Sequence, residues 1–131
     1  MSDDTRTFAS GWMGRALSSL AVLALLADAA VSLLSPGTMS AEMALTEFSP
    51  SLAPALGIIM LVCAIAYAIP RTAVIGAILV TGFLGGAICT HFRLGEFGSP
   101  PQLICLLLGV MTWGGLYLRD ARVRTLLSDG L

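Results

Sequence analysis

Four long apolar segments dominate the chain and limit what it can fold into. They lie at about residues 12–34, 52–69, 72–93 and 102–118, and each is bounded by prolines, glycines or charges. A bilayer-spanning helix needs about 20 mostly apolar residues, and backbone groups in lipid must form hydrogen bonds within their own segment. The pattern therefore predicts an all-α, antiparallel four-helix bundle embedded in a membrane, formed by residues 1–131 as a single transmembrane domain.

The composition also indicates a lipid environment. Of the 131 residues, 56% are hydrophobic and only 11% are charged, whereas soluble domains carry about 25% charged residues. A soluble chain of this length could not bury so much apolar surface. The net charge of −1 argues against a nucleic-acid partner, because nucleic-acid-binding domains usually carry a basic patch. The lipid bilayer is therefore the expected surroundings of this protein.

The placement of arginine predicts the orientation of the bundle. With four spans, both termini and the second connection lie on one side of the membrane. That side carries Arg6, Arg15, Arg71, Arg119, Arg122 and Arg124, whereas the opposite side carries Arg93. Arginine and lysine are enriched on the cytoplasmic side of membrane proteins. Both termini are therefore expected to be cytoplasmic, with loops at about residues 35–51 and 91–101 facing outward.

Polar residues gather at the predicted outer end of the bundle. Asp28 lies about six residues before the outer end of the first helix, which corresponds to a depth of roughly 9 Å. His91, Arg93 and Glu96 lie at the outer end of the third helix. An ionisable residue within a span costs about 2.5–3.5 kcal/mol and usually faces the bundle interior or a wet cavity. We therefore expect an outward-opening polar pocket that contains Asp28 and His91.

Each of these residues has a structural and a functional interpretation. Asp28 is either a neutral, hydrogen-bonded structural acid, or a general acid or proton-relay carboxyl in dry surroundings. His91 either caps its helix or exchanges protons near neutral pH. Arg93 either extends into the lipid headgroups, or binds an anion or pairs with Asp28. Glu96 is either a solvated loop charge or part of the site.

Further candidate ligand-binding residues lie in or beside the second, third and fourth segments: Met60, Thr81, Thr90 and Trp113, together with Glu96. Threonine within a helix commonly donates a hydrogen bond to a carbonyl one turn earlier, which is the structural alternative for both threonines. A zinc site is not expected, because the chain has one histidine and no clustered cysteines. The sequence leaves the cofactor unknown.

Glycines in the third segment suggest close helix packing. Gly82 and Gly86 form a G-x-x-x-G pair, with Gly85 beside them. Small residues at this spacing let transmembrane helices approach closely, so the Gly82 face is expected to be the tightest contact in the bundle. The alternative is that these glycines form a flat wall for a planar ligand.

The second half of the chain resembles a known family. The segments IPRTAVIGAILVTGFLGGAICTHFRLGE (69–96) and GVMTWGGLYLRDARVRTLL (109–127) are similar to the DoxX-like family of small four-helix bacterial membrane proteins. The motifs that carry the resemblance are Pro70-Arg71-Thr72, Gly85-Gly86-Ala87, Thr90-His91-Phe92-Arg93, Trp113-Gly114-Gly115 and Leu118-Arg119-Asp120. Family members often have a glutamate in the second helix, where this chain has Met60. They often have a lysine near the end of the first helix, where this chain offers Asp28.

The resemblance implies a multi-pass protein of the bacterial cytoplasmic membrane. The family takes its name from a subunit of a thiosulfate–quinone oxidoreductase, which implies binding of a lipophilic, quinone-like molecule and a redox-linked accessory role. Its partner would be a membrane redox protein or a second copy of the chain. The alternative is a small membrane enzyme, an isomerase, a cyclase or an epoxide-opening enzyme. It would use Asp28 as acid, His91 as base or proton shuttle, and Arg93 to stabilise developing negative charge.

Overall fold

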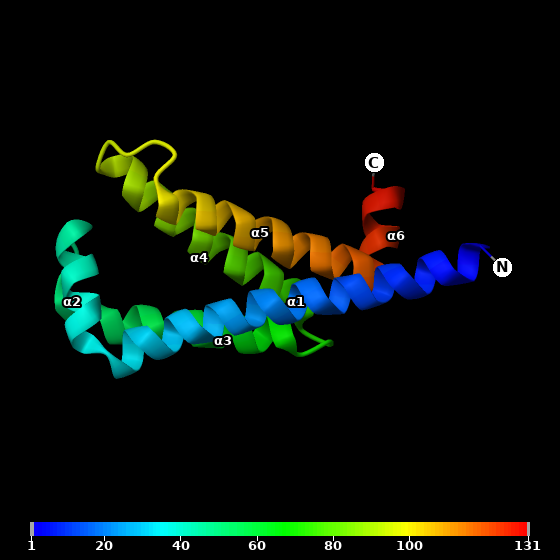
Figure 1. Cartoon of the computed structure of the whole chain (residues 1–131), viewed down its shortest axis with the longest axis horizontal. Coiled ribbons are helices and arrows are strands. Elements are labelled where there is room, and N and C mark those ends of the chain that lie inside the picture. The colour runs from blue at the N-terminus through cyan, green and yellow to red at the C-terminus, as the bar shows by residue number, and fades with distance from the viewer. Residues whose placement is uncertain (1, 131) are drawn as a thin grey trace.

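The computed structural model describes residues 2–130, which form a helical bundle without strands. In chain order the elements are α1 (Ser2–Leu34), α2 (Pro36–Leu45), the 3₁₀ turn η1 (Pro50–Leu52), α3 (Ala53–Ala68), α4 (Ala73–Arg93), α5 (Pro100–Arg119) and α6 (Ala121–Asp129) (Figure 1). Four helices are long and apolar enough to cross a membrane, namely α1, α3 extended by η1, α4 and α5. The prediction of an all-α, four-helix membrane protein is confirmed.

The four long helices pack in a ring. α1 contacts α3 and α5, and α4 contacts the same two helices from the opposite side. Among the described residues, the largest fully buried side chains include Tyr67, Leu25, Leu116 and Val80, one from each long helix. Large apolar side chains on the outer faces, such as Ile58, are exposed, as expected for surfaces that contact lipid. Sequence neighbours therefore pack side by side in the membrane.

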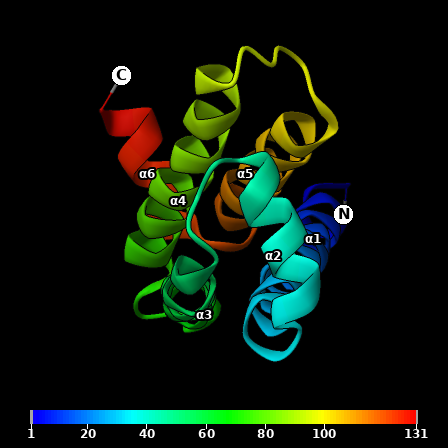
Figure 2. The same cartoon turned by 90° about the vertical axis from the view of Figure 1, so that its left-hand side faces the viewer.

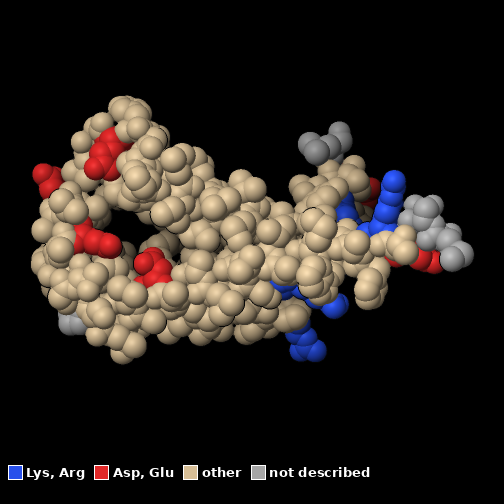
Figure 3. All heavy atoms as spheres, viewed as in Figure 1, with Lys and Arg blue, Asp and Glu red and all other residues tan. Residues whose placement is uncertain are grey.

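The bundle is closed at one end and splayed at the other. Both termini lie at the closed end, whereas α4 and α5 diverge from α1 and α3 toward the other end (Figure 1). Viewed from the splayed end, α2 lies in front of the long helices and partly covers them (Figure 2). Arginines gather at the closed end, where some acidic side chains lie as well, and a further group of acidic side chains lies at the splayed end, with an uncharged band between them (Figure 3). The splayed end is thus the predicted outer end.

Two boundaries differ from the sequence prediction. Residues 35–51, expected to form a loop, contain helix α2 and the turn η1. Met39 and Met43 are buried one helical turn apart and pack with Ala53, so α2 is held by an i, i+4 apolar pair. α1 also begins about ten residues earlier than expected, because polar residues outside the bilayer can continue a helix.

Glycines permit the closest helix contacts at the closed end. A Cβ on Gly115 would lie 2.5 Å from Ser18 Oγ and 3.1 Å from the carbonyl oxygen of Gly14, so α5 approaches α1 too closely for any side chain. A Cβ on Gly76 would overlap the backbone of Tyr67, at the α3–α4 contact. These contacts hold the long helices together at the closed end, whereas at the other end α4 and α5 diverge from α1 and α3.

The prediction for the Gly82 face is wrong. A Cβ built on Gly82, Gly85 or Gly86 would have no atom within 4 Å, apart from its own chain neighbours and helix backbone. The closest contacts occur instead where single glycines at the closed end face the backbone or a small side chain of another helix. The G-x-x-x-G spacing predicts a smooth helix face, but it does not determine what covers that face.

Candidate functional site

A cavity occupies the splayed end of the bundle. Its volume is about 590 Å³, and its walls come from α1, α2, α3, α4 and α5. Asp28 of α1 and His91 of α4 line this cavity, with Glu42 of α2 above them. The space-filling view shows the hollow beside acidic side chains (Figure 3). Most of the lining is apolar and includes Leu25 and Leu108.

A second cavity adjoins the first beside α3 and α4. It measures about 390 Å³. The two cavities share Glu42, Thr46, Phe83, Ala87 and His91. They therefore form one hollow region at the splayed end, with α4 contributing to both parts.

Asp28 presents a free carboxyl group to the larger cavity. Its backbone carbonyl accepts a hydrogen bond from Ser32 Oγ at 2.9 Å. Its carboxyl oxygens have no hydrogen-bond or ion-pair partner among the described residues. Asp28 is therefore not a hydrogen-bonded structural acid in this part of the chain, because its carboxyl group has no partner there. The carboxyl group is available to a bound molecule.

His91 is held in place by Glu96. The imidazole Nδ1 lies 2.6 Å from Glu96 Oε2, and only 16% of the histidine side chain is exposed. Glu96 is positioned in turn by the loop, since Gln102 Nε2 donates to its backbone carbonyl at 3.2 Å. A hydrogen bond on one ring nitrogen orients the other. The Nε2 atom of His91 is thus free to interact with a ligand at the mouth of the cavity.

Arg93 does not pair with Asp28. Its Nη2 donates to the carbonyl oxygen of Thr46 at 3.1 Å, and its Nη1 lies 3.6 Å from Glu47 Oε2. Both partners follow α2 directly, so the arginine ties the outer end of α4 to the segment that covers the cavity. Of the alternatives for Arg93, pairing with Asp28 is therefore wrong, because its guanidinium is engaged with Thr46 and Glu47.

The other sequence-predicted residues lie in three places. Met60 lines the larger cavity and Thr90 the smaller one. Thr81 and Trp113 line a separate groove between α4 and α5, where the indole Nε1 donates to Thr81 Oγ1 at 2.8 Å. Both threonines donate to a carbonyl one turn earlier, as expected: Thr81 to Ala77 at 2.7 Å and Thr90 to Gly86 at 3.0 Å.

Comparison with known proteins matches the chain to a family. The model of the DoxX-like family matches residues 16–115 of the chain. This chain belongs to the DoxX-like family. The matched segment contains Asp28, Met60 and His91, whereas α6 follows it. No curated protein and no solved structure matches the chain.

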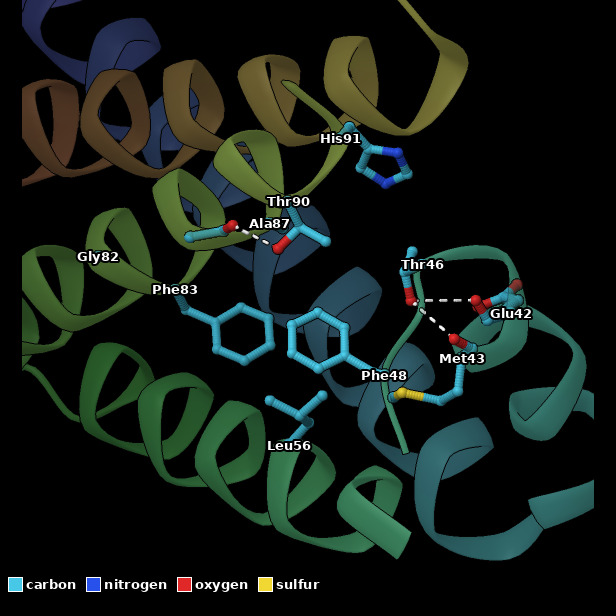
Figure 4. Close-up of a pocket in the computed structure, with 11 residues that line it drawn as sticks. Glu42, Met43, Thr46, Phe48, Leu56, Gly82, Phe83, Ala87, Thr90 and His91 are labelled. Atoms are coloured by element: carbon cyan, nitrogen blue, oxygen red, sulfur yellow. Dashed lines mark hydrogen bonds between the residues drawn. The ribbon is translucent and has the colours of Figure 1, made fainter. Parts of the chain in front are cut away.

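Sequence reasoning missed the aromatic wall of this DoxX-like protein. Phe48 and Phe83 face each other across the smaller cavity, with Leu56 beside them (Figure 4). Phe48 lies in the connection between α2 and α3, and its approach to α4 depends on how that connection folds over the bundle. No local pattern in the sequence indicates this contact.

The cavity of the DoxX-like protein combines three chemical features. Its apolar walls suit a hydrocarbon or aromatic ring, the free Asp28 carboxyl can donate or accept a hydrogen bond, and the His91 imidazole can exchange a proton. Within the described residues, no group of three or more histidine, cysteine, aspartate or glutamate side chains is placed to hold a metal ion. The three cysteines are unpaired, and Cys105 lines the larger cavity.

Proposed function

We propose that this DoxX-like membrane protein binds a lipophilic, quinone-like small molecule in the cavity at the splayed end of the bundle. One observation supports this most directly. The unpaired Asp28 carboxyl and the His91 imidazole come from α1 and α4 and line the same mainly apolar cavity of about 590 Å³. Small-molecule sites typically have volumes of about 300–1,000 Å³ and a few polar groups in apolar walls.

The polar groups suit a head group that accepts hydrogen bonds. A quinone has two carbonyl oxygens, which accept hydrogen bonds, and a ring that packs against apolar side chains. A protonated Asp28 carboxyl would donate to one of these oxygens, and His91 would donate from Nε2 as an imidazolium, because its Nδ1 already faces Glu96. The ring would then contact Met60, Phe83 and Leu84, which line the same cavity. This arrangement supports binding of the head group without covalent attachment.

The membrane setting of the proposal follows from charge and family. The arginines gather at the closed end, which supports both termini being cytoplasmic and the cavity opening on the outer side of a bacterial cytoplasmic membrane. Membership of the DoxX-like family supports a redox-linked accessory role beside a membrane partner or a second copy of the chain. Quinone exchange with that partner would proceed through the bilayer.

A cavity-filling variant tests binding directly. The purified full-length protein in lipid nanodiscs is titrated with 2,3-dimethoxy-5-methyl-6-decyl-1,4-benzoquinone. Ala87 lines both cavities, so Ala87→Phe should abolish saturable binding and leave the melting temperature within a few degrees. The matched control is Ala55→Phe, at an exposed position of α3, which should bind as the wild type does. Absence of saturable binding to the wild type, or equal binding by Ala87→Phe, would overturn the proposal.

The second candidate function is acid–base catalysis on a lipophilic substrate. The observation that favours it is the 2.6 Å contact between His91 Nδ1 and Glu96 Oε2, beside a cavity that also contains the Asp28 carboxyl. A carboxylate-oriented histidine with a second acid nearby can move protons to and from a substrate. In an isomerase, a cyclase or an epoxide-opening enzyme, Asp28 would protonate an oxygen and His91 would exchange the proton with solvent. Arg93 is engaged with Thr46 and Glu47 and takes no part in this acid–base mechanism.

A further inference from the structure

The smaller cavity extends along α4 toward the middle of the span. His91 lies near the outer end of α4, and Gly86 and Gly82 line the cavity five and nine residues earlier. At about 1.5 Å per residue, Gly82 lies roughly 14 Å deeper than His91 along the helix. The hydrocarbon core of a bilayer is about 30 Å thick. The inner part of this cavity is therefore at the depth of lipid chains.

The polarity of the cavity changes along the same direction. Its polar side chains are Glu42, Thr46, Thr90 and His91, and they lie toward the outer end (Figure 4). The inner part is lined by Gly82, Phe83, Gly86 and Leu56. An amphiphile would match this gradient, with its head group at the outer end and its hydrocarbon chain toward the midplane.

Gly82 and Gly86 leave room beside α4. A Cβ at either position would have no atom of another residue within 4 Å, apart from chain neighbours and the helix's own backbone. Both residues are exposed although they line the cavity. The cavity is therefore open laterally between α3 and α4 at this depth, and the opening is wide because these two positions lack side chains.

We infer that the α3–α4 gap beside Gly82 and Gly86 is a lateral opening through which the hydrocarbon chain of the bound amphiphile passes into the bilayer. The ligand is accordingly a long-chain lipophile, with its head group at Asp28 and His91 and its chain leaving beside the two glycines. This inference rests on the proposed function and adds the ligand class and the route of the chain. Phe48 and Phe83 are the walls against which the first part of the chain packs.

Two probes with the same head group test the inference. One is 2,3-dimethoxy-5-methyl-1,4-benzoquinone, which has no chain, and the other is its 6-decyl derivative. Both are titrated into nanodisc-embedded full-length protein. The wild type should bind the decyl probe more tightly. In Gly82→Leu and Gly86→Leu this preference should fall about tenfold, which corresponds to lost contact with two or more methylene groups, while binding of the chainless probe stays unchanged.

Gly85→Leu is the matched control. Gly85 also has free space at its Cβ, but it lines the groove that contains Thr81 and Trp113. This variant should keep the wild-type preference for the decyl probe, which excludes a general effect of a bulky residue on α4. All three variants should fold, because a Cβ at each position would have no atom within 4 Å, apart from chain neighbours and the helix's own backbone.

The outcomes separate the inference from the function on which it rests. If the wild type binds neither probe, the proposed function fails and the inference fails with it. If the wild type binds both probes equally, or if the decyl preference persists in Gly82→Leu and Gly86→Leu, the head-group site stands and the lateral opening is overturned. If the two variants instead convert a dimer into a monomer without a change in probe preference, the glycine face contacts a second copy and the inference is wrong.

Discussion

The hydroxyl group of Tyr67 donates a hydrogen bond of 2.7 Å to the backbone carbonyl of Thr112, which links α3 to α5 at the closed end of the bundle. Since the single phenolic proton is used in this bond, Ser18 Oγ, 2.9 Å from the same oxygen, must be the donor in the contact with α1. Arg119 lies over the tyrosine ring at 5.1 Å and donates to the Tyr67 carbonyl at 3.2 Å. One buried side chain thus joins three of the four long helices.

Removing this hydroxyl group should weaken the closed end. We expect Tyr67→Phe to lower the free energy of unfolding by about 1–2 kcal/mol, because two buried hydrogen bonds are lost in surroundings without water. The control is Tyr117→Phe, whose exposed side chain makes no hydrogen bond within residues 4–130. Thermal or denaturant unfolding in detergent measures both variants. Equal stability of the two would show that the network contributes nothing.

The two kinds of glycine should respond differently to a methyl group. Gly115→Ala places a Cβ 2.5 Å from Ser18 Oγ, so the α1–α5 contact must separate, at a cost of about 1–3 kcal/mol. Gly82→Ala enters free space and should be neutral or stabilising by up to about 1 kcal/mol through helix propensity. Melting temperatures of the purified variants decide the matter. A loss of stability in Gly82→Ala as large as that in Gly115→Ala would contradict the observed packing.

Local sequence patterns were sufficient for the four long helices but not for α2, α6 or the contacts between helices. Apolar length and the prolines at positions 36, 50, 54, 70, 100 and 101 mark where helices can begin or end, since these signals act over a few residues. The G-x-x-x-G pair at Gly82 was misleading because a smooth helix face needs a partner, and the splaying of α4 away from α3 removes it. The single glycines at positions 14, 76 and 115 carry the tight contacts without a comparable motif.

The candidate site was predicted in part for a similar reason. Asp28 and His91 line one cavity, and helix rise alone placed them at similar depth. Depth does not give direction around a helix, so the sequence could not show that Arg93 turns to Thr46 and Glu47 instead. The contribution of Phe48 depends on the fold of the segment after α2, which no periodic pattern describes.

The start of α6 should be sensitive to acid. Asp120 Oδ1 accepts a hydrogen bond of 2.9 Å from the backbone N–H of Arg122 and so caps the helix. Burial acts to raise the pKa of this carboxyl, but hydrogen bonds from Arg122 and the charges of Arg122 and Arg119 outweigh burial and hold the pKa below its ordinary value of 3.8. The carboxylate therefore stabilises the folded state above that value, and its contribution is lost as the pH falls through the lowered pKa.

Hydrogen exchange measures this prediction. In the wild type, amide protection at the start of α6 should be constant near neutral pH and should fall on acidification below 3.8. Asp120→Ala should lower the protection at neutral pH by about 1 kcal/mol in free energy, because the cap is lost, and should show little further change with acid. Asp120→Asn keeps a capping oxygen and is expected to lie between the two. An acid response that persists in Asp120→Ala would assign the titration to another group.

The orientation of the bundle gives a prediction of its own. In a variant with the three native cysteines changed to alanine, Ser49→Cys and Ser128→Cys place single thiols at exposed positions near opposite ends of the molecule. With the arginine-rich end in the cytoplasm, a membrane-impermeant maleimide added to intact cells should label Ser49→Cys and leave Ser128→Cys unlabelled until the cells are opened. The reverse pattern would invert the topology, and the cavity would then open to the cytoplasm.

The last prediction concerns Asp28 and separates binding from catalysis. Its carboxyl faces the cavity without a partner among residues 4–130, so Asp28→Asn and Asp28→Ala should both fold with nearly wild-type melting temperatures. Asparagine has a similar size and can still donate and accept hydrogen bonds, but it has no acidic proton to transfer. If the protein only binds a quinone-like molecule, Asp28→Asn should retain most of the affinity, and the affinity of Asp28→Ala should fall several-fold.

If Asp28 is a general acid, Asp28→Asn should bind a lipophilic epoxide or polyene substrate and fail to convert it, with a rate loss of about 10²–10⁴-fold. His91→Gln is the parallel test. Glutamine can keep the contact with Glu96 but cannot shuttle a proton at the cavity mouth, so turnover should fall if His91 has that role. Full turnover in Asp28→Asn would exclude the acid role and leave binding as the function of this cavity.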